Sequence, residues 1–195
     1  MNKNIFFIVV LINCNLIFGE PQGWGVYLGG SVAKGTGEKF EATGIKEKRF
    51  MTFPDFGISR GVLINEIPIV LGGGFQNKGY KIEFGKNEKE EVIARYFDMW
   101  VMMQHSFGPV FAKAGFFTGM FIDGIKKKEY QFLDSTLLDD ENLSPNKYGL
   151  DFGTKVGLEF PIATFSLSLE YIMGFKDQDE TKLNNLSFNI RYYIN

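Results

Sequence analysis

Residues 186–193 read LSFNIRYY, a stretch in which large apolar side chains alternate with polar ones. Successive side chains of an extended strand point to opposite faces, so this pattern predicts a strand with one apolar and one polar face. Residues 165–176 and 148–160 follow the same rule, and only Ile172 breaks the polar face. Three consecutive segments of this kind predict an antiparallel sheet.

Five further strands are predicted upstream, which makes about eight. They span residues 23–33, 54–64, 67–84, 92–105 and 110–122. Two features fit less well, because Arg60 interrupts an apolar face and Gly72-Gly73-Gly74 predicts a bend or bulge in its strand.

The predicted connections alternate in length. The long ones are residues 34–53, 85–91, 123–147 and 177–185, and the tight ones are residues 65–66, 106–109 and 161–164. In an up-and-down barrel all long connections then lie at one rim, and the tight turns lie at the other with both chain termini. Transmembrane barrels sort their loops in this way.

The residue types on the two faces decide which face meets lipid. The polar faces carry glycines together with Lys113, Lys155, Glu170 and Arg191, whereas the apolar faces carry Phe, Leu, Tyr and Met. Eight strands enclose a narrow interior, so the small and charged set is expected inside and the bulky apolar set outside. The sequence therefore predicts an all-β fold, a transmembrane antiparallel up-and-down β-barrel of about eight strands.

Strand register predicts a charge cluster inside this barrel. If the turn at residues 161–164 pairs Phe160 with Phe165, Lys155 lies directly across from Glu170. A similar pairing in the last hairpin places Arg191 opposite the same carboxylate. We therefore expect Lys155, Glu170 and Arg191 to form a structural cluster that plugs the interior, with water between separately solvated charges as the alternative.

The N-terminus resembles an export signal. Residues 1–4 include Lys3, residues 5–18 are mostly apolar, and a cleavage site after Gly19 is predicted. The expected organisation is a signal peptide at residues 1–19 and a barrel domain at residues 20–195. An alternative is a lipoprotein signal in which Cys14 is acylated.

Composition excludes several classes of function. The formal net charge is −2, without the basic surplus of nucleic-acid-binding proteins, so no nucleic acid partner is expected. The single cysteine, Cys14, lies in the predicted leader, which leaves the mature chain without a disulfide or a thiol nucleophile.

Individual motifs add no chemistry. His105 is adjacent to Ser106 but has no evident acid partner, so we expect a structural role rather than catalysis. The loop cluster Asp139-Asp140-Glu141 lacks the spacing of a calcium loop, and Lys126-Lys127-Lys128 is interpreted either as solvated or as contacting lipid phosphates. We expect no catalytic residue, cofactor or metal.

Several segments together carry a resemblance to a known family. They are residues 24–31, 96–102 (YFDMWVM), 108–119, 151–153 (DFG) with Gly157, and 186–193. In these patterns the chain resembles the bacterial outer membrane protein β-barrel domain family, the small porin-like barrels of the OmpA and OmpX type. The resemblance implies a bacterial outer-membrane location and insertion by the barrel assembly machinery. The last residue, Asn195, departs from the aromatic end usual in such barrels.

The expected function is a non-enzymatic structural or surface-interaction role, with outer-membrane lipids as partners and an unidentified surface ligand. A narrow porin-like transport channel is the first alternative, and an envelope lipid-modifying enzyme is the second. A soluble lipocalin-like carrier would need its large apolar side chains inside.

Overall fold

The computed structural model describes residues 23–41, 45–48, 50–85, 87–132, 135–178 and 181–194. The strands are β1 (Gly23–Thr36), β2 (Ile45–Lys48), β3 (Phe50–Ile64), β4 (Ile67–Phe84), β5 (Glu88–Phe107), β6 (Val110–Phe132), β7 (Ser135–Asn142), β8 (Leu150–Ile162), β9 (Phe165–Gly174) and β10 (Lys182–Ile194). Two short helices, η1 (Glu38–Phe40) and α2 (Pro145–Tyr148), lie in the connections. Within these described residues, no helix is both long and apolar enough to cross a membrane.

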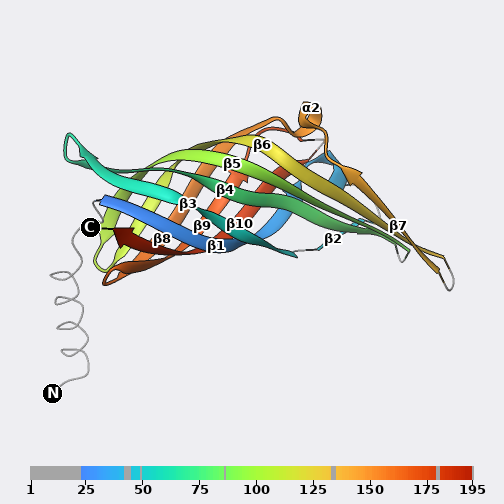
Figure 1. Cartoon of the computed structure of the whole chain (residues 1–195), viewed down its shortest axis with the longest axis horizontal. Coiled ribbons are helices and arrows are strands. Elements are labelled where there is room, and N and C mark those ends of the chain that lie inside the picture. Colours follow the sequence, from blue (N-terminus) through green and yellow to red (C-terminus); the bar gives the residue numbers. More distant parts are fainter. Residues whose placement is uncertain are drawn as a thin grey trace, which may run out of the picture.

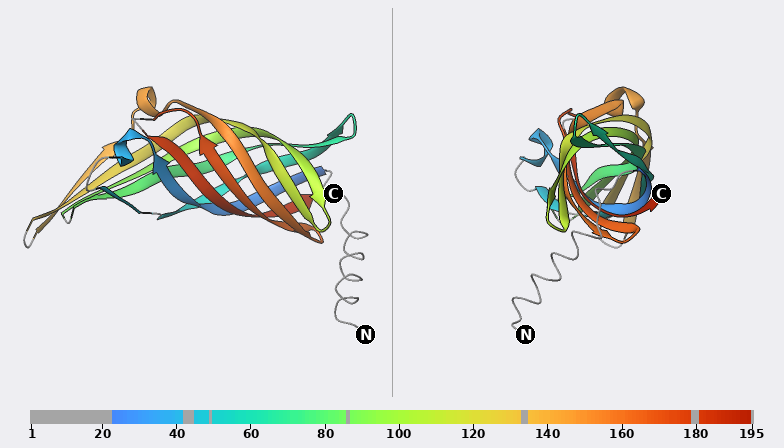
Figure 2. Two further views of the ribbon diagram at one scale, coloured as in Figure 1. Left: turned by 180° about the vertical axis from the view of Figure 1, so that it is seen from behind. Right: turned by 90° about the vertical axis from the view of Figure 1, so that its left-hand side faces the viewer.

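Eight of the strands close into a ring. Each pairs antiparallel with its neighbours in the order β1, β3, β4, β5, β6, β8, β9 and β10, and β10 returns to β1 (Figures 1 and 2). The closing pair runs from Trp24 opposite Ile194 to Thr36 opposite Lys182. The predicted up-and-down barrel of eight strands is confirmed.

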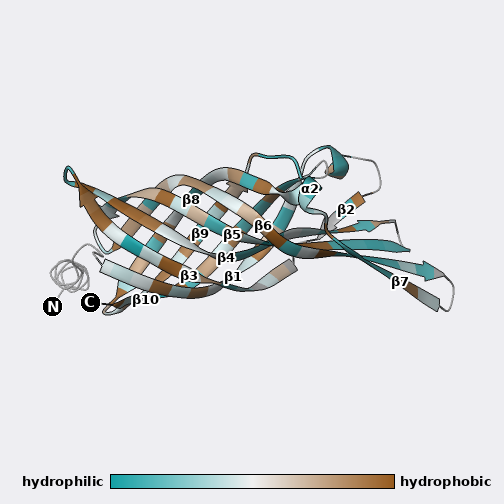
Figure 3. Ribbon diagram, turned by 45° about the horizontal axis from the view of Figure 1, so that its top comes forward, coloured by the Kyte–Doolittle hydropathy of each residue, from teal (hydrophilic) through white to brown (hydrophobic). Residues whose placement is uncertain are grey.

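The two faces of the wall differ as the alternation predicts. Along β10, Phe188 and Ile190 are more than half exposed on the outside, whereas Ser187 and Arg191 are buried inside. The apolar band covers the wall of the ring, and polar residues dominate the strands that project from one end (Figure 3). The outward orientation of the apolar faces is therefore confirmed.

The two ends of the barrel also differ. The β3–β4, β5–β6 and β8–β9 turns lie at the end where residue 23 enters and residue 194 leaves, which we call the turn end (Figure 1). Asn65 and Glu66 both have positive φ, at 49° and 67°, as a two-residue hairpin turn of type I′ requires. The long connections lie at the opposite end, which we call the loop end.

Much of what the sequence predicted as loop at this end is strand. The predicted loop 123–147 contains the outer part of β6, all of β7 and helix α2, and β2 lies within the predicted loop 34–53. With β2 and β7 at its edges, the outer parts of β4, β5 and β6 form a sheet that extends past the ring, and we call it the protruding sheet (Figure 1). Apolar alternation does not mark β2, β7 or the outer part of β6, because charged residues occupy both of their faces.

Cysteine labelling tests the two ends. In a chain whose Cys14 is replaced by serine, Lys127→Cys lies on the protruding sheet and Glu66→Cys lies in the β3–β4 turn. An impermeant maleimide on intact cells is expected to label the first and not the second, because a barrel with these ends presents the loop end outward. Equal labelling of both cysteines would contradict this orientation.

The triple glycine does not cause a bulge. β4 keeps a regular register with β3 and β5 through residues 72–74, so the predicted bulge is absent. Instead, a Cβ atom at Gly72 would collide with the indole ring of Trp100, and one at Gly74 would collide with the Tyr27 hydroxyl. These two glycines make room for inward aromatic rings.

Gly72→Ala and Gly73→Ala are expected to behave differently. The first puts a methyl group into the Trp100 ring, and overpacking of this kind costs about 1–3 kcal/mol. At Gly73 the nearest atom to a built Cβ is 3.4 Å away on Phe97, so that variant should stay within about 0.5 kcal/mol of the parent. Urea unfolding of both proteins in detergent measures the difference, and equal midpoints would contradict the steric account.

Candidate functional site

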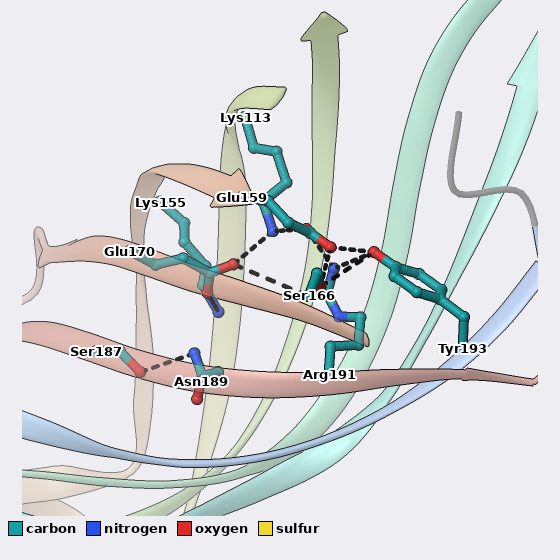
Figure 4. Close-up of polar contacts among 9 residues, drawn as sticks. All are labelled: Lys113, Lys155, Glu159, Ser166, Glu170, Ser187, Asn189, Arg191 and Tyr193. Atoms are coloured by element: carbon teal, nitrogen blue, oxygen red, sulfur yellow. Dashed lines mark hydrogen bonds and ion pairs between the residues drawn. The ribbon is translucent and has the colours of Figure 1, made fainter. Parts of the chain in front are cut away.

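Five charged side chains meet inside the barrel toward the turn end. They come from β6, β8, β9 and β10, and we call them the lower network: Lys113, Lys155, Glu159, Glu170 and Arg191 (Figure 4). Each is at most 5% exposed. Charges at this depth are stable only when paired and hydrogen-bonded.

Glu170 lies between three cations. Its carboxylate is 2.8 Å from Lys113 Nζ, 2.9 Å from Lys155 Nζ and 3.9 Å from Arg191 Nη2. The ammonium group of Lys155 also lies 4.2 Å from the centre of the Trp100 ring. The structure thus brings together all three residues of the predicted cluster.

Glu159 is a second anionic centre that the predicted cluster lacked. It accepts hydrogen bonds from Lys113 Nζ at 2.6 Å and Arg191 Nη1 at 2.7 Å, and from the hydroxyl groups of Ser166 and Tyr193 (Figure 4). Lys113 and Arg191 therefore bridge the two carboxylates, so the charges form one connected network.

The register that led to the predicted cluster is wrong. Glu170 pairs across β8 with Gly157 and across β10 with Ser187, while Lys155 pairs with Ile172. The β8–β9 turn is at residues 163–164, later than predicted, because β8 extends to Ile162. The charged groups meet diagonally, since long side chains span the offset between neighbouring strands.

A second charge cluster lies deeper toward the loop end, and we call it the upper triad. Lys78 Nζ lies 3.0 Å from Asp98 and 2.8 Å from Asp151, and none of the three side chains is more than 3% exposed. The ammonium group also lies 4.1 Å from the centre of the Phe117 ring. One lysine is thus shared by two buried carboxylates, one from β5 and one from β8.

Between the triad and the loop end the interior is apolar, which contradicts the expectation that the bulky apolar side chains all lie outside. The buried side chains of this apolar plug are Tyr80, Ile82, Val92, Ala94, Tyr96, Phe121, Tyr148 and Leu183. Phe40 of η1 packs on the Tyr80 ring, and Tyr148 of α2 packs on Phe121. The connections cover the lumen at this end, and large aromatic side chains fill the space beneath them.

Glu90 anchors the edge of the apolar plug. Its carboxylate accepts hydrogen bonds from Lys39 Nζ and the Tyr80 hydroxyl, and lies 3.2 Å from Lys126 Nζ. Burial acts to raise the pKa of Glu90, but the hydrogen bond and charge of Lys39 outweigh it and hold the pKa below its ordinary value.

This shift predicts an acid-dependent loosening of η1. A lowered pKa means that Glu90 contributes stability above its ordinary pKa of 4.5, and that the contribution is lost as pH falls through the lowered value. Hydrogen exchange at the Phe40 amide, corrected for its intrinsic pH dependence, should therefore accelerate at acid pH. Glu90→Gln should remove this acceleration, and an unchanged pH profile in that variant would contradict the assignment.

The protruding sheet carries the two charge runs that the sequence showed as separate. Lys126, Lys127 and Lys128 on β6 lie directly opposite Glu141, Asp140 and Asp139 on β7. On the neighbouring strands, Lys81 and Glu91 are 2.7 Å apart and Lys89 and Glu129 are 2.9 Å apart. Cross-strand charge pairing replaces apolar alternation as the source of register in this sheet.

Arg60 and His105 both lie toward the turn end of the barrel. Arg60 lies at the turn end with its guanidinium 5.3 Å from the centre of the exposed Trp24 ring. His105 is exposed near the β5–β6 turn, with its ring edge-on to Phe107 at 4.7 Å. Over the residues that the structure describes, no group of three or more His, Cys, Asp and Glu side chains is placed to hold a metal ion.

Comparison with known proteins identifies the fold. No protein-family model and no curated protein matches the sequence. The crystal structure of Ail, the attachment invasion locus protein of Yersinia pestis, matches with a TM-score of 0.51 and 11% identity, over 89% of this chain and 99% of that one. Neisserial surface protein A matches over 89% of this chain and 98% of its own, with 13% identity and a TM-score of 0.48. The fold assignment rests on the match to Ail, which has the higher TM-score. This chain has the fold of a small bacterial outer-membrane β-barrel.

Proposed function

We propose that this small outer-membrane barrel is a non-enzymatic surface protein that passes no solute and docks an extended segment of an external protein on strand β7. The observation that carries the proposal is the open edge of the protruding sheet. β7 pairs with β6 on one side, and within the described part of the chain no strand pairs with its other side. An unpaired edge offers backbone N–H and C=O groups to an added strand.

The chemistry of β7 indicates the partner. Leu137 and Leu138 are 58% and 71% exposed, and Asp139, Asp140 and Glu141 follow them directly. An extended segment with basic and apolar side chains would complement this strand. A second copy of the chain would place acidic runs against each other, which disfavours self-pairing.

The filled interior supports the absence of transport. The lower network, the upper triad and the apolar plug occupy the lumen at successive depths, and eight strands leave a width that side chains can fill. Single-channel recordings in planar bilayers should therefore give no conductance steps. Regular steps would favour the narrow channel instead.

A strand peptide tests the docking proposal. The probe is a fluorescent peptide of the length of β7 that alternates lysine and valine, and its control replaces lysine with glutamate. Anisotropy with the full-length protein in detergent should give saturable binding of the basic peptide only. The change Asp139→Asn, Asp140→Asn and Glu141→Gln should weaken binding about tenfold, and Asp177→Asn, an exposed acid elsewhere at the loop end, should not. Equal binding of both peptides, or none of either, would overturn the proposal.

A further inference from the structure

The lipid-facing wall contains an apolar groove at Gly73. Its floor is the backbone of residues 72–74 together with Gly57, and its sides are formed by Val26, Phe56, Ile58, Phe75, Phe97 and Met99. The groove has a volume of about 610 Å³. The aromatic rings of its rim pack on one another, Phe56 on Phe75 at 5.0 Å and Phe75 on Phe97 at 5.4 Å.

The fold does not require glycine at the centre of this groove. Gly72 and Gly74 leave no room for a Cβ because Trp100 and Tyr27 occupy the space inside the barrel. Gly73 faces outward, where a Cβ would make only ordinary contacts, at 3.4 Å or more. A side chain there would fill the groove, so its absence creates a space that packing of the barrel does not explain.

A polar pocket continues the groove toward the loop end. Phe75 pairs with Phe97, and the next pair on the same outward face of β4 and β5 is Asn77 with Arg95. Asn77 and Arg95 line this pocket of about 240 Å³ with Asp123 and Asn142. Arg95 and Asp123 form an ion pair of 3.1 Å in which both side chains are more than half exposed. A guanidinium carries five N–H donors, so this pair leaves Arg95 able to bind an anion as well.

We propose that this groove and pocket bind one phosphorylated, acylated glycolipid of the outer leaflet. An acyl chain would lie over Gly73 among the rim residues, which already face the hydrocarbon of the membrane. Its headgroup would then reach the level of Arg95, where the guanidinium takes a phosphate and the exposed amide of Asn142 suits sugar hydroxyl groups. The loop end faces outward, which selects the outer leaflet as the source.

Native mass spectrometry of the full-length protein in detergent tests this proposal, with hexa-acylated lipid A as the probe and phosphatidylglycerol as the comparison. The parent is expected to retain one lipid A in preference to phosphatidylglycerol. Gly73→Leu should weaken lipid A binding about tenfold by filling the groove. Arg95→Gln should weaken it about fivefold by removing the cation.

Matched variants separate the site from general effects. Ala114→Leu adds bulk to the lipid-facing wall on β6, and Arg60→Gln removes an exposed arginine at the turn end, so neither should change lipid A binding. A heat-dependent shift in gel mobility establishes that each variant is folded. The proposal is overturned if Gly73→Leu binds lipid A like the parent, if phosphatidylglycerol competes equally, or if the parent forms a dimer that Gly73→Leu abolishes.

Discussion

Glu170→Gln is expected to lower the free energy of unfolding by about 3–5 kcal/mol, because breaking a buried ion cluster by removing one charge leaves its partners uncompensated. The glutamine keeps the size of the side chain, leaves Lys113 and Arg191 paired with Glu159, and removes the carboxylate that pairs with Lys155. Urea midpoints of the protein refolded in detergent, followed by circular dichroism, measure the loss.

The matched control removes the whole predicted cluster. Lys155→Met, Glu170→Leu and Arg191→Met together leave Lys113 paired with Glu159 at 2.6 Å and fill the space with apolar side chains. Replacing buried ion pairs by apolar residues of similar volume is often neutral, so the triple variant should be more stable than the single one. Small and equal losses in both variants would mean that water solvates these charges separately.

Lys78→Met is expected to have an effect of similar size in the upper triad. The variant leaves Asp98 and Asp151 buried without their shared cation, which should cost about 3–5 kcal/mol. The comparable surface change is Lys81→Met. The ion pair between Lys81 and Glu91 is partly exposed, so its loss should lower the free energy of unfolding by less than about 1 kcal/mol.

A charge-free triad tests the cause of that loss. When Asp98→Asn and Asp151→Asn accompany Lys78→Met, no uncompensated carboxylate remains, so much of the lost stability should return. The same unfolding assay applies. A triple variant as unstable as Lys78→Met would assign the loss to the missing contact between the Lys78 ammonium group and the Phe117 ring rather than to the unpaired carboxylates.

The fold was predictable because alternation identifies each strand and the face that each side chain takes, and the short turns make neighbouring strands antiparallel. Lys155, Glu170 and Arg191 point inward because each occupies a polar position in the alternation along its strand. The same holds for Glu159. Ile172, the exception to the polar face of its strand, is buried inside the barrel in a cluster with Trp100, Met102 and Phe117.

The contacts within the site were not predictable, because they depend on the offset between strands. A turn placed two residues early changes every cross-strand pair, and Ala163, with a φ of 55°, carries no residue type that marks the true turn. The pairing of β6 with β7 did have a sequence signal that was missed. The basic run Lys126-Lys127-Lys128 and the acidic run Asp139-Asp140-Glu141 lie at equal sequence distances from one turn, as the opposite strands of a hairpin must. The apolar plug was not predicted, because the interior was expected to hold small and charged side chains, whereas the inward residues at the loop end are large and apolar.

Closure of the ring between β1 and β10 sets the timing of folding. Trp24 and Ile194 belong to the first and last segments of the described chain, so the wall has two open strand edges until synthesis has passed its final residues. Pairing over such a sequence separation is slow, and exposed edges beside apolar faces aggregate in water. The nascent polypeptide thus needs an escort that shields it between export and insertion, and loss of its last strand should leave no smaller barrel but a substrate for proteolysis.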